Sequence, residues 1–221
     1  MVDTSQLTTT PLQTRTGSIL VLDDDEAVRD GLADLLGAAE GLQVVGSAAS
    51  TGEALTLVGA AEPDLVLLDA RLPGPTGISA CRELRSAHRD VRCLLLTAFD
   101  DEEALLATAL AGAAGHLVKQ VGGTAVVDEV RRVAGEPDVV SPTAVAAVRA
   151  RLGLARVVEG RVVDGWGAVD PGREVLELVL QGRTDLEIAG RLGLHPRAVR
   201  AEVLGLFARL GSRRRGPLVP A

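Results

Sequence analysis

The chain has 221 residues, of which 47% are hydrophobic and 24% charged, with a formal net charge of −7. This length allows one large domain or two smaller ones. No apolar run approaches the ~18 residues of a membrane span, and residues 1–17 lack the order of a secretory signal. Cys81 and Cys93 are too few for a disulfide framework and lack zinc-ligand spacing, so we expect two buried cysteines in a cytoplasmic protein.

Charge divides the chain into two parts. Residues 1–140 carry a net charge of −12, whereas residues 141–221 carry +5. This asymmetry favours two domains with different partners. The basic part could meet nucleic acid or the acidic part of the same chain, and charge alone does not decide between them.

Short apolar runs alternate with helical stretches from Ser18 onward, after a Thr- and Ser-rich tail at 1–17 that we expect to be disordered. Strict alternation predicts a doubly wound, five-stranded parallel sheet covered on both faces, which would form one α/β domain over residues 18–135. The predicted strands are 18–23, 42–46, 64–69, 91–97 and 115–118. The predicted helices are 25–37, 51–61, 76–88, 100–112 and 122–134.

The second part of the chain reads as all-helical. Residues 136–167 form a predicted linker with one short helix, which opens at Ser141-Pro142 and ends at Arg151. Three further helices are expected from Asp170, from the capping box Thr184–Glu187 and from His195-Pro196. Two short helices joined by a glycine-bearing turn predict a helix-turn-helix domain over 168–215, followed by a tail at 216–221.

Polar residues stand where four of the apolar runs end. They are Asp23-Asp24, Asp69, Thr97 and Lys119, and Lys119 is the only lysine of the chain. The carboxyl ends of parallel strands meet at one edge of a sheet, where such folds bind ligands, so we expect these side chains to converge.

The expected cluster has a defined chemistry. Crowded carboxylates repel, and an all-oxygen site of this kind favours Mg²⁺. Once the cation neutralises the charge of the carboxylates, Asp69 could act as a nucleophile toward phosphorus. Thr97 and Lys119 would then hold the phosphoryl oxygens. The rival prediction is a phosphatase with an aspartate nucleophile, which would want a second acid two residues later, where this chain has Arg71.

These segments resemble a response-regulator receiver domain, a flavodoxin-like fold. The resemblance rests on Leu22-Asp23-Asp24-Asp25, on Pro63 to Gly74 around Asp69, on Leu96-Thr97-Ala98 and on Val118-Lys119. Phe99 to Glu102 and Ala111 to Gly115 further resemble the NarL/FixJ (LuxR-type) branch, near the DevR-like regulators. The resemblance implies that Asp69 accepts a phosphoryl group from a sensor histidine kinase. It implies an Mg²⁺ site made of Asp23, Asp24, Asp69 and the Arg71 carbonyl.

One residue departs from the receiver pattern. The family carries an aromatic residue three positions before the lysine, and that aromatic is thought to move inward with the residue at 97. This chain has His116 there. The sequence leaves open whether His116 is a switch residue or an ordinary surface histidine.

Residues 168–211 resemble the LuxR-type helix-turn-helix. The resemblance implies that Arg197 and Arg200 share an outward face of the recognition helix and contact DNA, with Arg209 and Thr184 as further candidates. Ala201, Glu202 and Gly205 depart from the family pattern.

We therefore expect a two-component response regulator that controls transcription and is not an enzyme. Its expected partners are a histidine kinase and DNA, with a second copy of the chain as a further candidate and no membrane. The alternative is a receiver that acts through protein contacts, with a degenerate helix-turn-helix that binds DNA weakly or not at all.

Overall fold

A computed structural model describes most of the chain. The described residues are 17–72, 76–98, 101–119, 122–136, 139–152, 157–158, 161–162 and 171–212. The expected tails fall outside them, except that Gly17 already belongs to the first strand. The sequence-based domain boundaries stay predictions.

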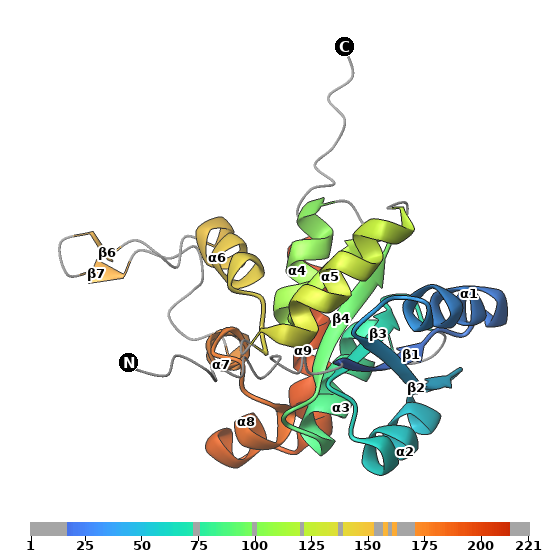
Figure 1. Ribbon diagram of the computed structural model, residues 1–221. Coiled ribbons are helices and arrows are strands. Elements are labelled where there is room, and N and C mark those ends of the chain that lie inside the picture. Colours follow the sequence, from blue (N-terminus) through green and yellow to red (C-terminus); the bar gives the residue numbers. More distant parts are fainter. Residues whose placement is uncertain are drawn as a thin grey trace, which may run out of the picture.

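Five parallel strands form the predicted sheet (Figure 1). Their spatial order is β2-β1-β3-β4-β5, which places the strand with Asp69 at the centre. The strands are β1 (Gly17–Leu22), β2 (Leu42–Ala48), β3 (Leu65–Asp69), β4 (Arg92–Thr97) and β5 (Gly115–Val118). This order brings the ends of β1, β3, β4 and β5 side by side at one edge.

Alternate residues of the central strands enter two different cores. In β3, Leu65 and Leu67 pack into one core, whereas Val66 and Leu68 pack into the other, because successive side chains of a strand point to opposite faces. Both faces are buried, which explains why the strands are almost wholly apolar.

Five helices cover the sheet. Residues of α1 (Glu26–Gly37) and α5 (Gly123–Gly135) complete the first core. On the opposite face lie α2 (Thr51–Ala61), α3 (Gly77–Ala87) and α4 (Asp101–Ala111). Cap residues fix several of these starts: the Ser50 hydroxyl accepts from the Glu53 amide, and the Asp25 carboxylate accepts from the Ala27 and Val28 amides.

The remaining helices agree closely with the sequence predictions. They are α6 (Pro142–Arg151), α7 (Pro171–Leu180), α8 (Asp185–Leu192) and α9 (Pro196–Ser212). The Thr184–Glu187 capping box is present at the start of α8. One feature was not expected: β6 (Val157–Val158) pairs antiparallel with β7 (Arg161–Val162) inside the predicted linker.

The C-terminal helices pack against the receiver-like part on its α3–α4 side. Helix α4 contacts α6, α7 and α9, and α3 contacts α8 and α9 (Figure 1). One apolar cluster therefore runs from β1 and β3 through α3 and α4 into α7, α8 and α9. Leu110 of α4 and Leu206 of α9 are both fully buried members of it. None of the described helices is long and apolar enough to cross a membrane.

Candidate functional site

Three carboxylates meet at the carboxyl edge of the sheet, as the sequence predicted. One carboxylate oxygen from each of Asp23, Asp24 and Asp69 lies within 4.8 Å of the other two. Asp23 and Asp69 are buried, whereas Asp24 is exposed. Such a set has oxygen donors, surplus negative charge and one open side, which fits a hydrated divalent cation such as Mg²⁺.

Lys119 reaches into the same cluster from the end of β5. Its Nζ lies 2.9 Å from Asp69 Oδ2 and 3.5 Å from Asp23 Oδ2. Burial alone would lower the pKa of Lys119, but the hydrogen bond to Asp69 and the nearby Asp23 charge raise it, so the amine stays protonated. Burial raises the pKa of Asp23, opposed by the Asp25 amide and by Lys119.

The described segment directly after β3, residues 70–72, is held by close contacts. The Arg71 amide donates to Asp69 Oδ1 over 3.1 Å, while Asp69 Oδ2 faces Lys119. Gly77, at the start of α3, lies so close to this loop that an added Cβ would be 2.5 Å from the Asp69 carbonyl oxygen. The nucleophile candidate is therefore fixed by its own loop and by the first turn of α3. The Arg71 side chain is exposed.

The two expected switch residues lie at neighbouring strand ends. Thr97 is buried at the end of β4, and its carbonyl accepts from the Lys119 amide over 2.8 Å. His116 is half-buried on β5, with its Nδ1 3.0 Å from the hydroxyl of Thr108 on α4. The Thr108 hydroxyl donates to the Ala104 carbonyl over 2.6 Å, so it accepts from the imidazole N–H. His116 is thus tied to α4 and is not an unattached surface side chain.

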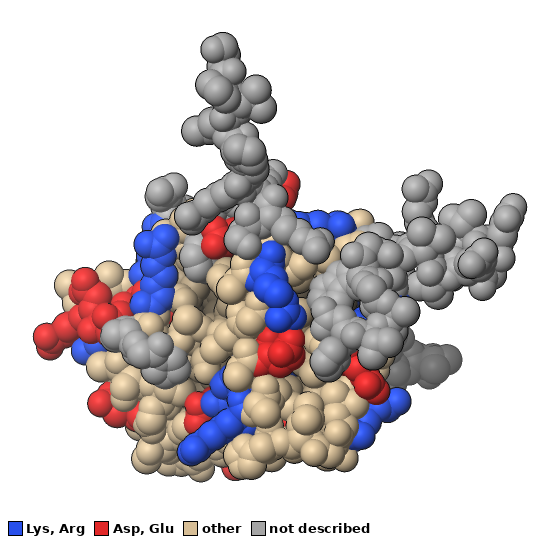
Figure 2. Space-filling model, turned by 180° about the vertical axis from the view of Figure 1, so that it is seen from behind, with Lys and Arg blue, Asp and Glu red and all other residues tan. Residues whose placement is uncertain are grey.

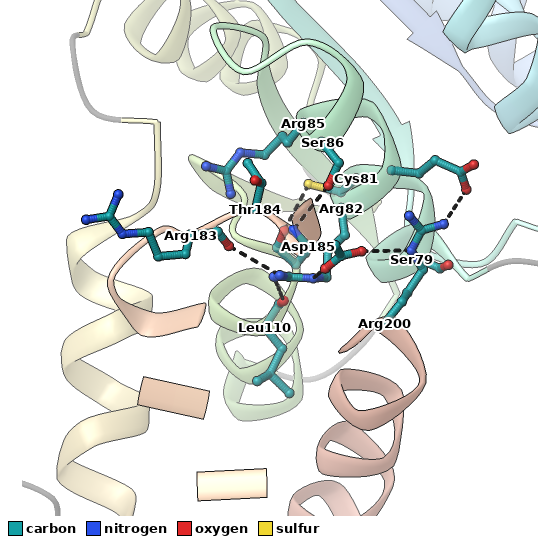
Figure 3. A network of polar contacts seen from close by, with 12 residues as sticks. Ser79, Cys81, Arg82, Arg85, Ser86, Leu110, Arg183, Thr184, Asp185 and Arg200 are labelled. Carbon is teal, nitrogen blue, oxygen red and sulfur yellow. Dashed lines mark hydrogen bonds and ion pairs between the residues drawn. The ribbon is translucent and has the colours of Figure 1, made fainter. Parts of the chain in front are cut away.

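A buried ionic cluster joins the two parts of the chain (Figure 3). Arg82 of α3 is 2% exposed, and its Nε donates to Asp185 Oδ1 over 2.6 Å. Its other nitrogens donate to the carbonyls of Leu110 and Arg183. Burial lowers the pKa of Arg82, opposed by Asp185, but a guanidinium stays protonated in proteins.

The same cluster holds Arg200 of α9. Its Nε donates to Asp185 Oδ2 over 2.9 Å, and its Nη1 lies 2.5 Å from Glu83 Oε2 of α3. The expectation that Arg197 and Arg200 share an outward face is wrong in this arrangement. Arg197 is exposed, whereas Arg200 points away from solvent and pairs with Glu83 of α3 and with Asp185 of α8.

The other two candidates for DNA contact also have partners. Arg209 forms an ion pair with Glu202 at 2.7 Å. Thr184 is buried, and its hydroxyl accepts from the Glu187 amide in the capping box. Their contact with DNA stays a prediction.

Sequence reasoning did not single out Arg82, Asp185 or Glu83. Arg82 and Asp185 lie 103 residues apart. The only signal was the place of Asp185 in the first turn of a predicted helix, which normally indicates an exposed acid. On the face seen in Figure 2, basic side chains are scattered among acidic and uncharged ones.

Comparisons with known proteins agree with this geometry. Residues 19–131 match the family model described as a response regulator receiver domain. The chain is also 41% identical over 197 residues to the "DNA-binding transcriptional activator DevR/DosR" of Mycobacterium tuberculosis, covering 89% of each chain. The chain belongs to the response regulators of the NarL/FixJ (LuxR-type) family.

Solved response regulators share the fold. A LuxR-family two-component response regulator from Aurantimonas sp. is 31% identical, with a TM-score of 0.54 over 62% of this chain and 97% of that one. RcsB from Salmonella enterica, bound to the promoter rprA, matches over 90% of this response regulator and 95% of its own chain. Its TM-score is 0.53 and its identity 18%, so it supports the fold alone. With relatives that regulate transcription, regulation through protein contacts alone is not favoured.

Proposed function

We propose that this response regulator accepts a phosphoryl group on Asp69 from a sensor histidine kinase and controls transcription through the helix-turn-helix of α8 and α9. The observation that carries the proposal is the convergence of Asp23, Asp24, Asp69 and Lys119 at the end of the sheet. We assign the receiver to residues 18–135 and the DNA-binding domain to 168–215.

The acceptor step follows from the contacts of Asp69. One carboxylate oxygen attacks phosphorus, and the bond between phosphorus and the donor's histidine nitrogen breaks. The Arg71 amide and the Gly77 contact fix the direction of the carboxylate. Lys119 is placed to move from Asp69 Oδ2 to a phosphoryl oxygen, and the Thr97 hydroxyl is the second candidate for that role.

The acidic cluster is the proposed Mg²⁺ site. Asp24, Asp69 and the Arg71 carbonyl would hold the ion, with Asp23 assisting through water. When bound, the ion neutralises charge on the transferring phosphoryl oxygens. The exposure of Asp24 supports this role, because Mg²⁺ keeps several of its waters.

The docked position of α9 is the proposed resting state. With Arg200 held by Glu83 and Asp185, it is not available to bases or phosphates. DNA binding therefore requires α9 to leave α3. His116 and Thr108 offer a route for the signal, since they connect the strand end beside the phosphoryl site to α4, which contacts α9.

Asp69→Asn tests the acceptor. In the presence of Mg²⁺ and a small phosphodonor, the natural chain should take up one covalent phosphoryl group and the variant none. Removal of Mg²⁺ by a chelator should also abolish labelling. Asp128→Asn, at an exposed acid of α5, should leave labelling unchanged. Intact-mass measurement reads the result, and a label that persists in Asp69→Asn would refute the assignment.

Glu83→Gln tests the resting state without altering the recognition helix. Loss of one partly exposed ion pair to Arg200 should raise the affinity of the unphosphorylated chain for its own promoter about two- to fivefold. Glu129→Gln, which breaks a comparable pair with Arg132 on α5, should not change it. Titration by fluorescence anisotropy at fixed salt measures both, and equal affinities of all three proteins would contradict the proposal.

A further inference from the structure

A polar groove lies between α3, the start of α6 and the end of α7. It has a volume of about 410 Å³, and its lining includes Arg85, Arg89 and Gly182. Three segments that are far apart in sequence thus supply its walls. It is distinct from the acidic site at the carboxyl edge of the sheet, because none of the acidic-site residues lines it.

Arg85 is the unusual member of this lining. It is 4% exposed, and its Nη2 donates to the Gly182 carbonyl over 3.1 Å. Its Nε is buried and has no hydrogen-bond partner. Among the described residues, no carboxylate lies within ion-pair distance of this guanidinium. Gly112 makes room for the side chain, since an added Cβ there would overlap Arg85 Nη1.

A comparison with Arg82, one helical turn earlier, shows what Arg85 lacks. Arg82 is equally buried, but the Asp185 carboxylate neutralises it at 2.6 Å. In Figure 3 the Arg85 guanidinium lies apart from that pair. The Gly182 carbonyl follows the C-terminus of α7, and a helix terminus supplies only about half of a negative charge. A buried cation with so little compensation is costly unless an anion joins it.

The rest of the groove indicates the kind of anion. Arg89, in the turn just beyond the end of α3, is mostly exposed and pairs with Glu187 at 3.1 Å, so it can swing toward a ligand at little cost. Asp90 is the acidic residue of the lining, which leaves the two arginines in excess. The remaining walls are mainly apolar. They come from Val139, Val140, Pro142, Val145 and Leu180.

We propose that this groove binds a small oxyanion, a phosphate or carboxylate group on a compact apolar body, with Arg85 and Arg89 as its cationic ligands. Planar guanidinium groups suit both oxyanions, because each offers paired N–H donors. The bound anion bridges α3 to the end of α7 and so favours the docked arrangement. That last consequence rests on the proposed function; the binding site does not.

The test is calorimetric titration of the full chain with inorganic phosphate, phenyl phosphate and benzoate. A chelator and fixed ionic strength keep metal binding and general salt effects out of the measurement. We expect saturable binding of at least one of the two aromatic anions, tighter than that of inorganic phosphate. Which of them binds more tightly distinguishes a phosphate ester from a carboxylate as the natural ligand class.

Variants decide whether the groove is responsible. Arg85→Gln should weaken binding by about tenfold or more, as expected for loss of a charged hydrogen bond. Arg89→Gln, at an exposed position that is not needed for folding, should weaken it severalfold. Arg191→Gln removes an exposed arginine of α8 outside the groove and should leave binding unchanged.

Two outcomes would overturn the site: no saturable binding of any probe up to about 10 mM, or equal binding by Arg85→Gln, Arg89→Gln and the natural chain. A separate titration with promoter DNA tests the bridging role. The bound probe should weaken DNA binding by the natural chain but not by Arg85→Gln. Because calorimetry uses no DNA, failure of DNA binding would leave the test of the site intact.

Discussion

Asp69 combines burial with a fixed direction. Its two oxygens face different donors, the Arg71 amide and the Lys119 ammonium, and the first turn of α3 closes over its backbone. The carboxylate therefore loses little freedom when it reacts, because the folded chain has already oriented it. Gly77 is the residue on which this closure depends.

Gly77→Ala should lower both stability and phosphoryl uptake. The new methyl group would meet the Ala70 Cα and the Asp69 carbonyl oxygen at 2.5 Å, which forces the loop or α3 to shift. Overpacking of this kind costs about 1–3 kcal/mol. Urea unfolding measures the loss, and the rate of labelling by a small phosphodonor measures the displacement of Asp69.

Gly31→Ala is the matched control for that substitution. Gly31 lies on an exposed turn of α1, where an added Cβ has no neighbour within 4 Å. Because alanine is the better helix former, we expect a gain of up to about 1 kcal/mol and unchanged labelling. Equal behaviour of the two alanine variants would show that the close approach at Gly77 has no energetic consequence.

At the scale of elements, the sheet could be predicted because four of its five strands end at or just before a polar residue. The runs before Asp23, Asp69, Thr97 and Lys119 contain almost no polar residue, so their ends are sharp, and parallel strands bring such ends together. Helix starts were predictable where a capping side chain marks them, as at Thr184. These signals are local in sequence.

What could not be predicted depends on docking. Nothing near Asp185 in sequence indicates that it lies fully buried against Arg82, because the contact exists only when α8 packs on α3. The same docking turns Arg200 away from solvent. The β6–β7 pair is different: each strand is only two residues long, too short for a periodic pattern in the sequence to reveal it.

The stability of the contact between α3 and α8 should fall most when one charge of the Arg82–Asp185 pair is removed and the other is left without a partner. Asp185→Leu leaves a buried guanidinium without its main partner, and we expect a loss of about 3–5 kcal/mol. Arg82→Met leaves Asp185 with Arg200 as a remaining partner, so its loss should be smaller. The double variant should be more stable than Asp185→Leu alone.

A double-mutant cycle from urea unfolding measures this coupling. The matched pair for comparison is Asp128 with Arg131 on α5, where both side chains are exposed and the interaction should be below about 1 kcal/mol. Additive losses at Arg82 and Asp185 would show that their ion pair does not hold the helices together.

At the scale of the whole molecule, the shared core predicts that the described parts unfold together. One apolar cluster includes Leu110 of α4 and Leu206 of α9, so melting of either part would expose apolar surface of the other to water. We expect one calorimetric transition for the unphosphorylated chain. Leu110→Ala and Leu206→Ala should each lower the temperature of this transition and leave it single. The expected loss in the free energy of unfolding is about 2–5 kcal/mol for each.

Val130→Ala is the comparison for these two variants. Val130 is fully buried in the other core, between the sheet and α5. In a single cooperative unit it should shift the same transition. Two resolved transitions, with Leu206→Ala moving one and Val130→Ala moving the other, would show that the parts unfold independently.

Lys119 makes the chain selective toward reagents that modify amines. Since every other basic side chain is arginine, the ε-amine that completes the acidic cluster is the single one in the chain. Acylating reagents, amine-coupled biosensor surfaces and lysine acetylation would therefore all converge, among side chains, on the group that pairs with Asp69. Attachment of the protein through carboxylates or an added thiol would leave Lys119 unmodified. Limited treatment with an acetylating reagent would instead abolish phosphoryl acceptance without altering any aspartate.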